Sequence, residues 1–245
     1  MKHPTLERFG EIDLLRALAI LLMIVYHTVY DLSAFFAFPI DPRSFGWLLL
    51  ERITAHLFLL IVGVSFAVSW EKLERKGTSY NARLKKYALR ALAILVCGML
   101  VSLATAIVDP HTYVRFGILH LIAASVLLLP FFFTLRAWNF LLGMIVIMIA
   151  PVVHDVSVST SLLLPLGIAP STFASVDYFP LFPWFGTVLI GASLGNLLYG
   201  RSLLQIHLPL EKPWQRALTF PGRYSLLIYL VHQPIILALL WMFLK

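Results

Sequence analysis

Long apolar runs separated by short polar breaks dominate this sequence. Seven of these runs lie near residues 14–33, 53–70, 87–107, 116–133, 138–153, 179–199 and 223–244. A helix needs about 20 apolar residues to cross the hydrocarbon core of a bilayer, and most of the runs have about that length. The chain is 60% hydrophobic and only 13% charged, so a soluble domain is excluded. The pattern predicts one all-α domain over residues 1–245, a polytopic bundle of seven transmembrane helices.

Two segments fit this pattern less well than the others. The run at 138–153 is short and ends at Pro151, and the segment at 157–169 is apolar enough to be interfacial or re-entrant. The first run continues through His27 without a small-residue cleavage site, which predicts an uncleaved first span. In the sixth run, Gly191 and Gly195 are four residues apart, a spacing that predicts close helix packing.

The basic residues are distributed as a topology signal. Of the 19 Lys and Arg residues, only four fall in the segments expected outside, namely Arg43, Arg52, Arg115 and Lys245. The positive-inside rule therefore predicts a cytoplasmic N-terminus and an external C-terminus. The net charge of +7 is explained in this way and indicates no nucleic-acid partner. The expected location is the cytoplasmic membrane of a prokaryote, with the lipid bilayer as the first partner.

Ionisable residues inside the first span are the leading functional candidates, because such groups are costly in a membrane. Arg16 and His27 are eleven residues apart, which places them on one helix face about 16 Å apart. Asp31 follows His27 by four residues and is expected to pair with it. A carboxylate beside an imidazole fixes the tautomer of the ring, which suits a general base or an acyl-accepting nucleophile.

Further histidines are expected in the outer half of the membrane. His56, His120 and His232 all fall at this level under the predicted topology, so we expect one outward-facing pocket built with His27 and Asp31, to which Asp177 is a further candidate. At the inner face, Arg16, Arg90 and Arg223 lie near helix ends and are candidates for binding phosphate groups. A single cysteine, Cys97, excludes an intramolecular disulfide and a cysteine-based metal cluster, and we predict no metal site.

Five motifs in order along the chain resemble a known family. They are the stretch from Glu11 to Ile20 with its continuation through Met23–His27 to Tyr30–Leu32, then FLLIVGVSF at 58–66, FGILHLI at 116–122, FPLFPWFG at 179–186 and GRYSLLIYLVHQP at 222–234. Together they resemble the prokaryotic heparan-α-glucosaminide N-acetyltransferase catalytic-domain family. The Arg-x10-His spacing of Arg16 and His27 is also similar to that of broader membrane acyltransferases that acetylate surface sugars. Ala17 stands where the family often has Gly.

The resemblance implies a helical-bundle enzyme that moves an acetyl group from cytoplasmic acetyl-CoA to an amino or hydroxyl group on the far side of the membrane. The acceptor it implies is a sugar or amino sugar. Arg16 and His27 match the Arg-x10-His motif, and His120 and His232 belong to two further motifs. In the mechanism we expect, His27 deprotonates the acceptor or takes the acyl group, and His120 or His232 stabilises the thioester oxyanion. The sequence leaves a homo-oligomer open.

Two other functions compete with acyl transfer. A b-type haem protein also needs histidines buried in the membrane, and His56 with His120 or His27 with His232 would be the ligand pairs. A transporter more often contains internal repeats around a site at mid-membrane, and this sequence has none that we detect.

The predicted topology is tested with fused reporters. Because the basic residues are so unevenly distributed, reporters fused after Lys76 and after Arg201 are expected to be cytoplasmic, and one in the 109–115 loop external. An external Arg201 fusion together with a cytoplasmic Lys76 fusion would show that the number of spans is wrong.

Overall fold

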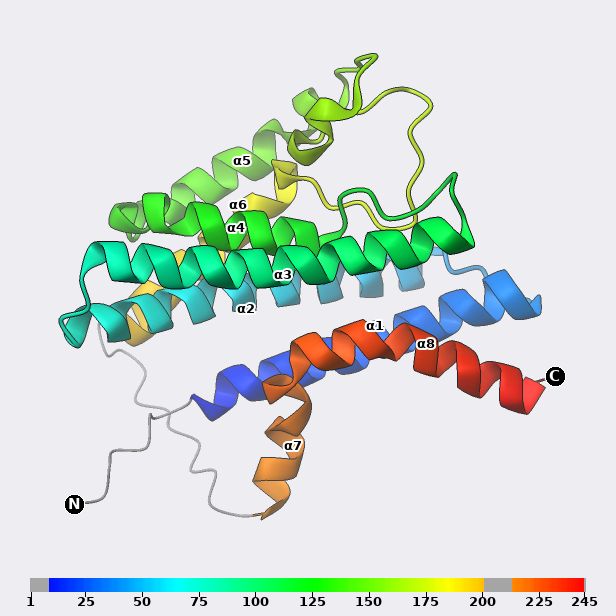
Figure 1. Ribbon diagram of the computed structural model, residues 1–245, viewed down its shortest axis with the longest axis horizontal. Helices are drawn as coiled ribbons and strands as arrows, with labels where there is room; N and C mark the ends of the chain where they lie inside the picture. Colours follow the sequence, from blue (N-terminus) through cyan, green and yellow to red (C-terminus); the bar gives the residue numbers. More distant parts are fainter. Residues whose placement is uncertain (1–8, 201–212, 245) are drawn as a thin grey trace. The chain divides into compact units, whose positions relative to one another are not determined.

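The computed structural model describes residues 9–200 and 213–244 and is mostly helical in these ranges (Figure 1). The helices of the first half are α1 (Gly10–Phe36), α2 (Phe45–Arg75), α3 (Tyr80–Val108) and α4 (Ile118–Phe132), followed by the 3₁₀ turn η1 (Phe133–Leu135). The remaining elements are α5 (Trp138–His154), η2 (Ser161–Leu166), α6 (Leu181–Gly195), the π-helical η3 (Asn196–Gly200), α7 (Pro213–Arg223) and α8 (Ser225–Leu244). The predicted all-α, polytopic fold is confirmed.

The chain divides into two compact units. The first contains Met1–Phe58 and Gln205–Lys245, and the second contains Leu59–Leu204. The first unit therefore holds α1, the beginning of α2, α7 and α8, whereas the second holds the rest of α2 and α3 to α6. Arg201, one of the basic residues used for the topology, lies outside the described residues.

Each predicted apolar run corresponds to a helix. In the described ranges, six helices are long and apolar enough to cross a membrane, and α5, with 17 residues, is a shorter apolar helix. The helices α2 and α3 contain 31 and 29 residues and extend well past their apolar runs, because their polar ends are still good helix formers. At about 1.5 Å per residue, α5 is about 26 Å long, slightly less than the hydrocarbon core.

Helix directions within the second unit support a crossing by α5. Leu60 of α2 contacts Gly191 of α6, and Val64 contacts Gly195 one turn further along both helices, so α2 and α6 run in the same direction. If two helices cross the membrane in the same direction, the chain between them must cross the membrane an odd number of times. Since α3, α4 and α5 connect them, crossings by α3 and α4 require one by α5 too, and the count of seven spans stays a prediction. This observation also confirms the close packing predicted for Gly191 and Gly195.

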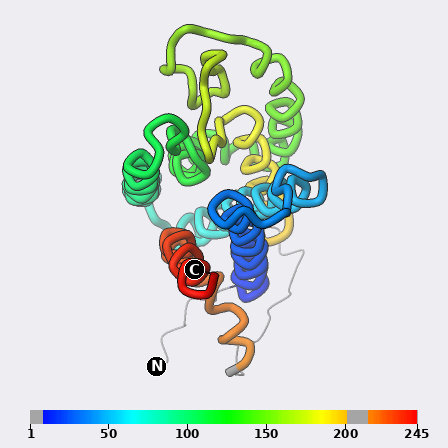
Figure 2. Tube along the Cα trace, turned by 90° about the vertical axis from the view of Figure 1, so that its right-hand side faces the viewer, coloured from blue at the N-terminus to red at the C-terminus, as the bar shows by residue number. Residues whose placement is uncertain are grey.

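Helix directions in the first unit also agree with an odd number of spans. Contacts between α1 and its C-terminal partners occur in the same order along both segments, from Asp13 with Arg223 to Phe36 with Trp241. The helices α1 and α8 are therefore parallel neighbours (Figures 1 and 2). If both helices cross the membrane, this parallel arrangement places the start of α1 and the end of α8 on opposite sides, as seven spans require. Which end faces the cytoplasm stays a prediction.

Two parts of the fold differ from the sequence-based expectation. The helix α7 was not predicted, because its eleven residues, PWQRALTFPGR, are too short and too polar to form an apolar run. Pro213 stands at its first position, where the missing N–H and the fixed φ angle are tolerated. The segment at 157–169 forms the short 3₁₀ turn η2 and an isolated bridge between Ser157 and Ala169. Its predicted place at the membrane interface stays a prediction.

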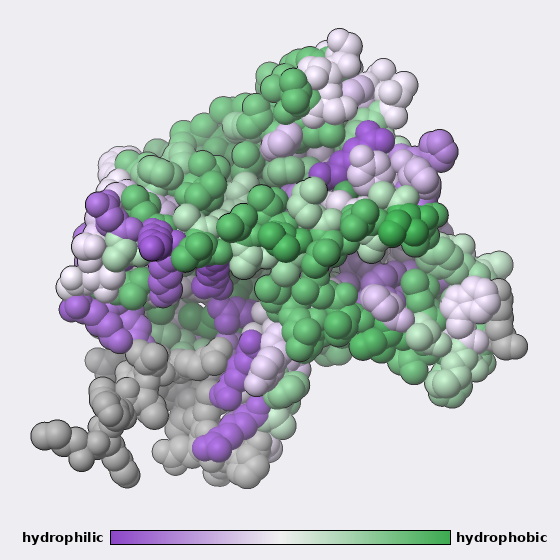
Figure 3. Space-filling view, in the orientation of Figure 1, coloured by the Kyte–Doolittle hydropathy of each residue, from purple (hydrophilic) through white to green (hydrophobic). Residues whose placement is uncertain are grey.

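One face of α3 is apolar and exposed, as expected for contact with lipid. Leu92, Val96, Met99 and Leu103 recur every three to four residues along this face, and each is more than half exposed. Figure 3 shows an apolar band over this helix and polar residues at the end where α2 meets α3. A stripe of this kind would be unstable in water but is stable against acyl chains.

We predict that Gly63→Ala disrupts the contact between α2 and α6. A methyl group at Gly63 would meet backbone atoms of Val188 and Ala192, which cannot move aside as a flexible side chain can. The expected cost is about 1–3 kcal/mol, measured as a lower unfolding midpoint of the detergent-solubilised protein. Gly46→Ala is the matched control, because Gly46 lies in the same helix and nothing lies within 4 Å of a methyl group there. Equal stability of the two variants would contradict this packing.

Candidate functional site

Two buried imidazole rings meet in the first unit. His27 on α1 and His232 on α8 lie with their ring centroids 4.8 Å apart and their planes nearly perpendicular, at 86°. They come together because α1 and α8 are parallel and because each histidine faces the other helix. The structure therefore brings together two of the four histidines predicted for the outer pocket. Rings in edge-to-face contact leave no room for a porphyrin between them, so this pair does not fit the haem alternative.

Backbone carbonyl groups fix the tautomer of both rings. Nδ1 of His27 lies 2.9 Å from the carbonyl oxygen of Met23, and Nδ1 of His232 is paired in the same way with the carbonyl of Tyr229. A carbonyl oxygen only accepts, so each Nδ1 carries the hydrogen and donates it. In the neutral rings Nε2 is then an unprotonated acceptor. These two nitrogens are the atoms that could take a proton or attack a carbonyl carbon.

Asp31 is fully buried and is held by the neighbouring helix. Both of its carboxylate oxygens accept hydrogen bonds from the side-chain amide of Gln233, at 2.7 and 2.9 Å. The predicted pairing of Asp31 with His27 is therefore wrong. The reason is that Nδ1 of His27 donates to the Met23 carbonyl of its own helix, while Gln233 of α8 offers Asp31 a donor. Asp31 thus holds α1 and α8 in register beside the histidine pair.

Gln233 is the site residue that the sequence analysis missed. Its amide nitrogen is used by Asp31, which orients the amide and leaves Oε1 buried, with no partner among the described residues. Nε2 of His232 is likewise buried and unpaired within the described ranges. The sequence contained a signal for Gln233, because His232, Gln233 and Pro234 form one polar break in the last apolar run. Buried acceptors without donors favour a ligand that brings N–H or O–H groups.

A second polar cluster lies at the other end of α1. Asp13 is almost completely buried, and its carboxylate lies 2.9 Å from Arg16 and 3.8 Å from Nε of Arg223. Gly222 approaches the backbone of Asp13 so closely that a side chain at Gly222 would collide with it. The structure thus brings together two of the three arginines predicted to bind phosphate, with a carboxylate between them that was not predicted. The cluster carries one net positive charge.

The remaining predicted residues lie elsewhere. His56 is half-buried on the part of α2 that belongs to the first unit. His120 and Arg90 belong to the second unit, where His120 is buried on α4 against Gly98 of α3 and Arg90 is exposed. The pairing of His120 with the first-unit histidines therefore stays a prediction, as does the phosphate-binding role of Arg90.

Asp177 has a structural role in the second unit. Its carboxylate accepts a hydrogen bond of 3.1 Å from the backbone N–H of Ile118, the first residue of α4. The backbone N–H of Phe179 also donates to the carbonyl of Phe116, at 2.9 Å. Asp177 therefore caps α4 from a distant loop and fixes the segment that leads into α6. The bond between Phe179 and Phe116 joins two of the resemblance motifs, at 116–122 and 179–186.

Comparison with known proteins gives one match. The family model described as heparan-alpha-glucosaminide N-acetyltransferase, catalytic, matches residues 8–234. Comparisons with curated proteins and with solved structures give no match. The matched range contains the histidine pair, Asp31, the cluster around Asp13 and all five motifs, and the last ten residues of α8 lie beyond it.

We predict that Gln233→Leu destabilises the protein by about 1–3 kcal/mol, because it leaves the Asp31 carboxylate buried without a donor. The measurement is the unfolding midpoint in detergent. The double variant Asp31→Leu with Gln233→Leu is expected to recover part of this loss, since neither polar group then remains unpaired. Tyr30→Phe is the control, because it removes an exposed hydroxyl at the adjacent position of α1. A Gln233→Leu protein as stable as the wild type would contradict the role of this bond.

Proposed function

Because the chain belongs to the heparan-alpha-glucosaminide N-acetyltransferase catalytic family, we propose that it transfers an acetyl group from cytoplasmic acetyl-CoA to a sugar-like acceptor on the opposite side of the membrane. The family match and the six span-length helices support a multi-pass membrane acetyltransferase. The donor, the acceptor class and the direction of transfer are our proposals. An amino or hydroxyl group of the acceptor is the nucleophile.

The observation that carries the proposal is the fixed tautomer of His27. Its Nδ1 donates to the Met23 carbonyl, so Nε2 is unprotonated in the neutral ring and is held beside His232. In direct transfer, Nε2 takes the proton of the acceptor while the acceptor oxygen or nitrogen bonds to the acetyl carbon. The carbon–sulfur bond then breaks, and the imidazolium returns the proton to the CoA thiolate. In a two-step reaction, Nε2 itself bonds to the acetyl carbon as the carbon–sulfur bond breaks and CoA leaves as the thiolate. The acceptor oxygen or nitrogen then bonds to the acetyl carbon, the bond to Nε2 breaks, and the acceptor proton passes to the thiolate.

Neighbouring residues position the acceptor. His232 Nε2 and Gln233 Oε1 both accept hydrogen bonds and have no donor among the described residues, which suits the several O–H and N–H groups of a sugar. This acceptor role differs from the one expected from the sequence, in which His232 stabilises the thioester oxyanion. A neutral ring whose Nδ1 is used by Tyr229 has no hydrogen on Nε2 to donate to a thioester oxyanion. Asp31 acts as a positioning residue, because it holds the α8 segment that carries His232 and Gln233.

The arginine cluster is suited to the phosphate end of the donor. Arg16 and His27 both lie on α1, one continuous helix, and are about 16 Å apart along its axis. An extended pantetheine arm would cover this distance. Arg16 and Arg223 both contact Asp13, and a guanidinium with its five N–H groups is able to hold a carboxylate and a phosphate at the same time.

The proposal is tested with purified protein, labelled acetyl-CoA and either glucosamine or glucose as acceptor, followed by mass spectrometry of protein and product. We predict acetylated acceptor with the wild type and a turnover about 10²–10⁴-fold lower with His27→Gln at saturating acetyl-CoA. Binding of CoA is expected to be unchanged in this variant. His111→Gln is the matched control, because His111 is exposed in the loop after α3. Turnover of a well-folded His27→Gln protein within a few-fold of the wild type would exclude His27 from the chemistry.

A further inference from the structure

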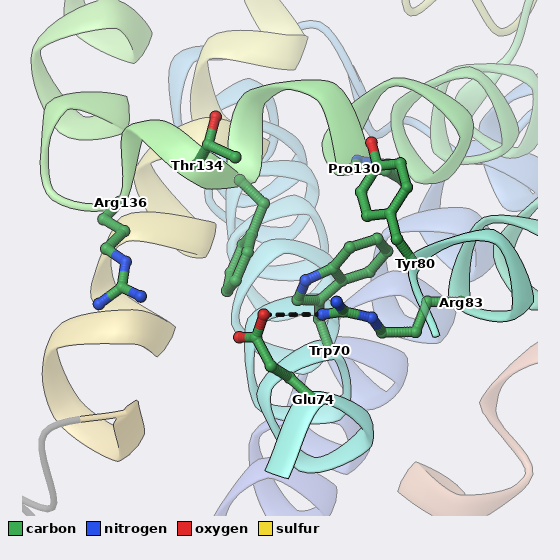
Figure 4. A pocket seen from close by; sticks show the side chains of 8 residues that line it. Trp70, Glu74, Tyr80, Arg83, Pro130, Thr134 and Arg136 are labelled. Atoms are coloured by element: carbon green, nitrogen blue, oxygen red, sulfur yellow. Dashed lines mark hydrogen bonds and ion pairs between the residues drawn. The ribbon is translucent and has the colours of Figure 1, made fainter. Parts of the chain in front are cut away.

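A cavity of about 240 Å³ lies within the second unit, where the end of α2 meets the start of α3 and the turn after α4. Figure 4 shows its lining, in which Arg83 and Arg136 come from α3 and from the link between η1 and α5. Trp70, Tyr80 and Thr134 are also in the wall. None of these residues belongs to the histidine pair or to the cluster around Asp13.

Arg83 is the most unusual group in this cavity. Its side chain is only 10% exposed, and its guanidinium lies over the ring of Trp70, 4.7 Å from the centroid. The one carboxylate that it contacts is that of Glu74, at 3.1 Å, which is 51% exposed. Its Nε is buried and has no partner among the described residues. A guanidinium cannot lose its charge, so burial favours a further anionic partner for the unpaired N–H.

The other walls indicate what kind of anion fits. Arg136 is exposed and adds a second guanidinium, so that with Glu74 the lining carries one net positive charge. Tyr80 and Arg83 lie in the first turn of α3, whose N-terminus favours negative charge. The rings of Trp70 and Tyr80 offer apolar surface beside these donors. Several donors together with an aromatic wall suit a phosphate ester better than an isolated carboxylate.

We propose that this cavity is a binding site for a phosphate ester, with Arg83 and Arg136 as its two anion contacts. Two molecules carry this chemistry to such a place. One is the nucleotide end of CoA, a source that rests on the proposed acetyl transfer. The other is a phospholipid headgroup, which requires no enzymatic activity. In both cases the anion provides Arg83 with the second partner that the described residues do not supply.

The experiment measures binding to the full-length protein in detergent by calorimetry, with no turnover. The probes are adenosine 3′,5′-bisphosphate, which represents the nucleotide end of CoA, and dihexanoyl phosphatidic acid, which represents a headgroup. Arg136→Gln removes the exposed guanidinium without touching a packed group, and Arg83→Lys keeps the charge but removes the planar fork. Each is expected to raise the dissociation constant at least about tenfold. Lys85→Gln is the control, because Lys85 is exposed on α3, carries the same charge and does not line the cavity.

The outcomes distinguish the two sources of phosphate. They also distinguish failure of this binding site from failure of the proposed acetyl transfer. Binding of the bisphosphate or of the lipid with this pattern of variants supports the site and identifies the source. The inference is overturned if neither probe binds the wild type, or if Lys85→Gln weakens binding as much as Arg136→Gln. Acetyl transfer with an unchanged KM for acetyl-CoA in Arg136→Gln, together with absent probe binding, would reject this site and leave the proposed function intact. Probe binding without any acetyl transfer would support this site and reject the proposed function.

Discussion

A carboxylate buried between apolar helices must have a donor, and in this protein that requirement holds the histidine pair together. Asp31 is completely buried on α1, and Gln233 of α8 donates to both of its oxygens. The bond fixes the rotation and the register of α8 against α1. With the register fixed, His232 meets His27 one turn earlier along α1, and Phe36 meets Trp241 further on. The catalytic proposal therefore depends on a bond in which His27 takes no part.

The fold was largely predictable because the membrane restricts what a chain can do. Each apolar run had to become a helix, since only helices satisfy their own backbone groups in lipid. Apolar runs do not reveal a short polar helix such as α7, nor do they show where α2 and α3 end. The packing between α2 and α6 was predictable at Gly191 and Gly195, because small residues four apart indicate close approach.

The site was predictable only in part. Membrane-buried histidines indicated His27 and His232 as candidates, and the structure places them in contact. The partner of Asp31 was predicted wrongly, because a sequence shows a neighbour four residues away but not Gln233, which is 202 residues away. Asp13 was missed for the same reason, since its role becomes visible only when Arg16 and Arg223 are both beside it. Long-range polar pairs are set by helix register, which one sequence does not specify.

We propose that this chain passes an acetyl group across a membrane by way of His27. The most direct measurement uses sealed vesicles that contain the protein, with glucosamine trapped inside and labelled acetyl-CoA added outside. We predict labelled N-acetylglucosamine inside vesicles with the wild-type protein, and at least about a hundredfold less with His27→Gln. Product that forms only when donor and acceptor share one side, or forms equally in both proteins, would contradict it.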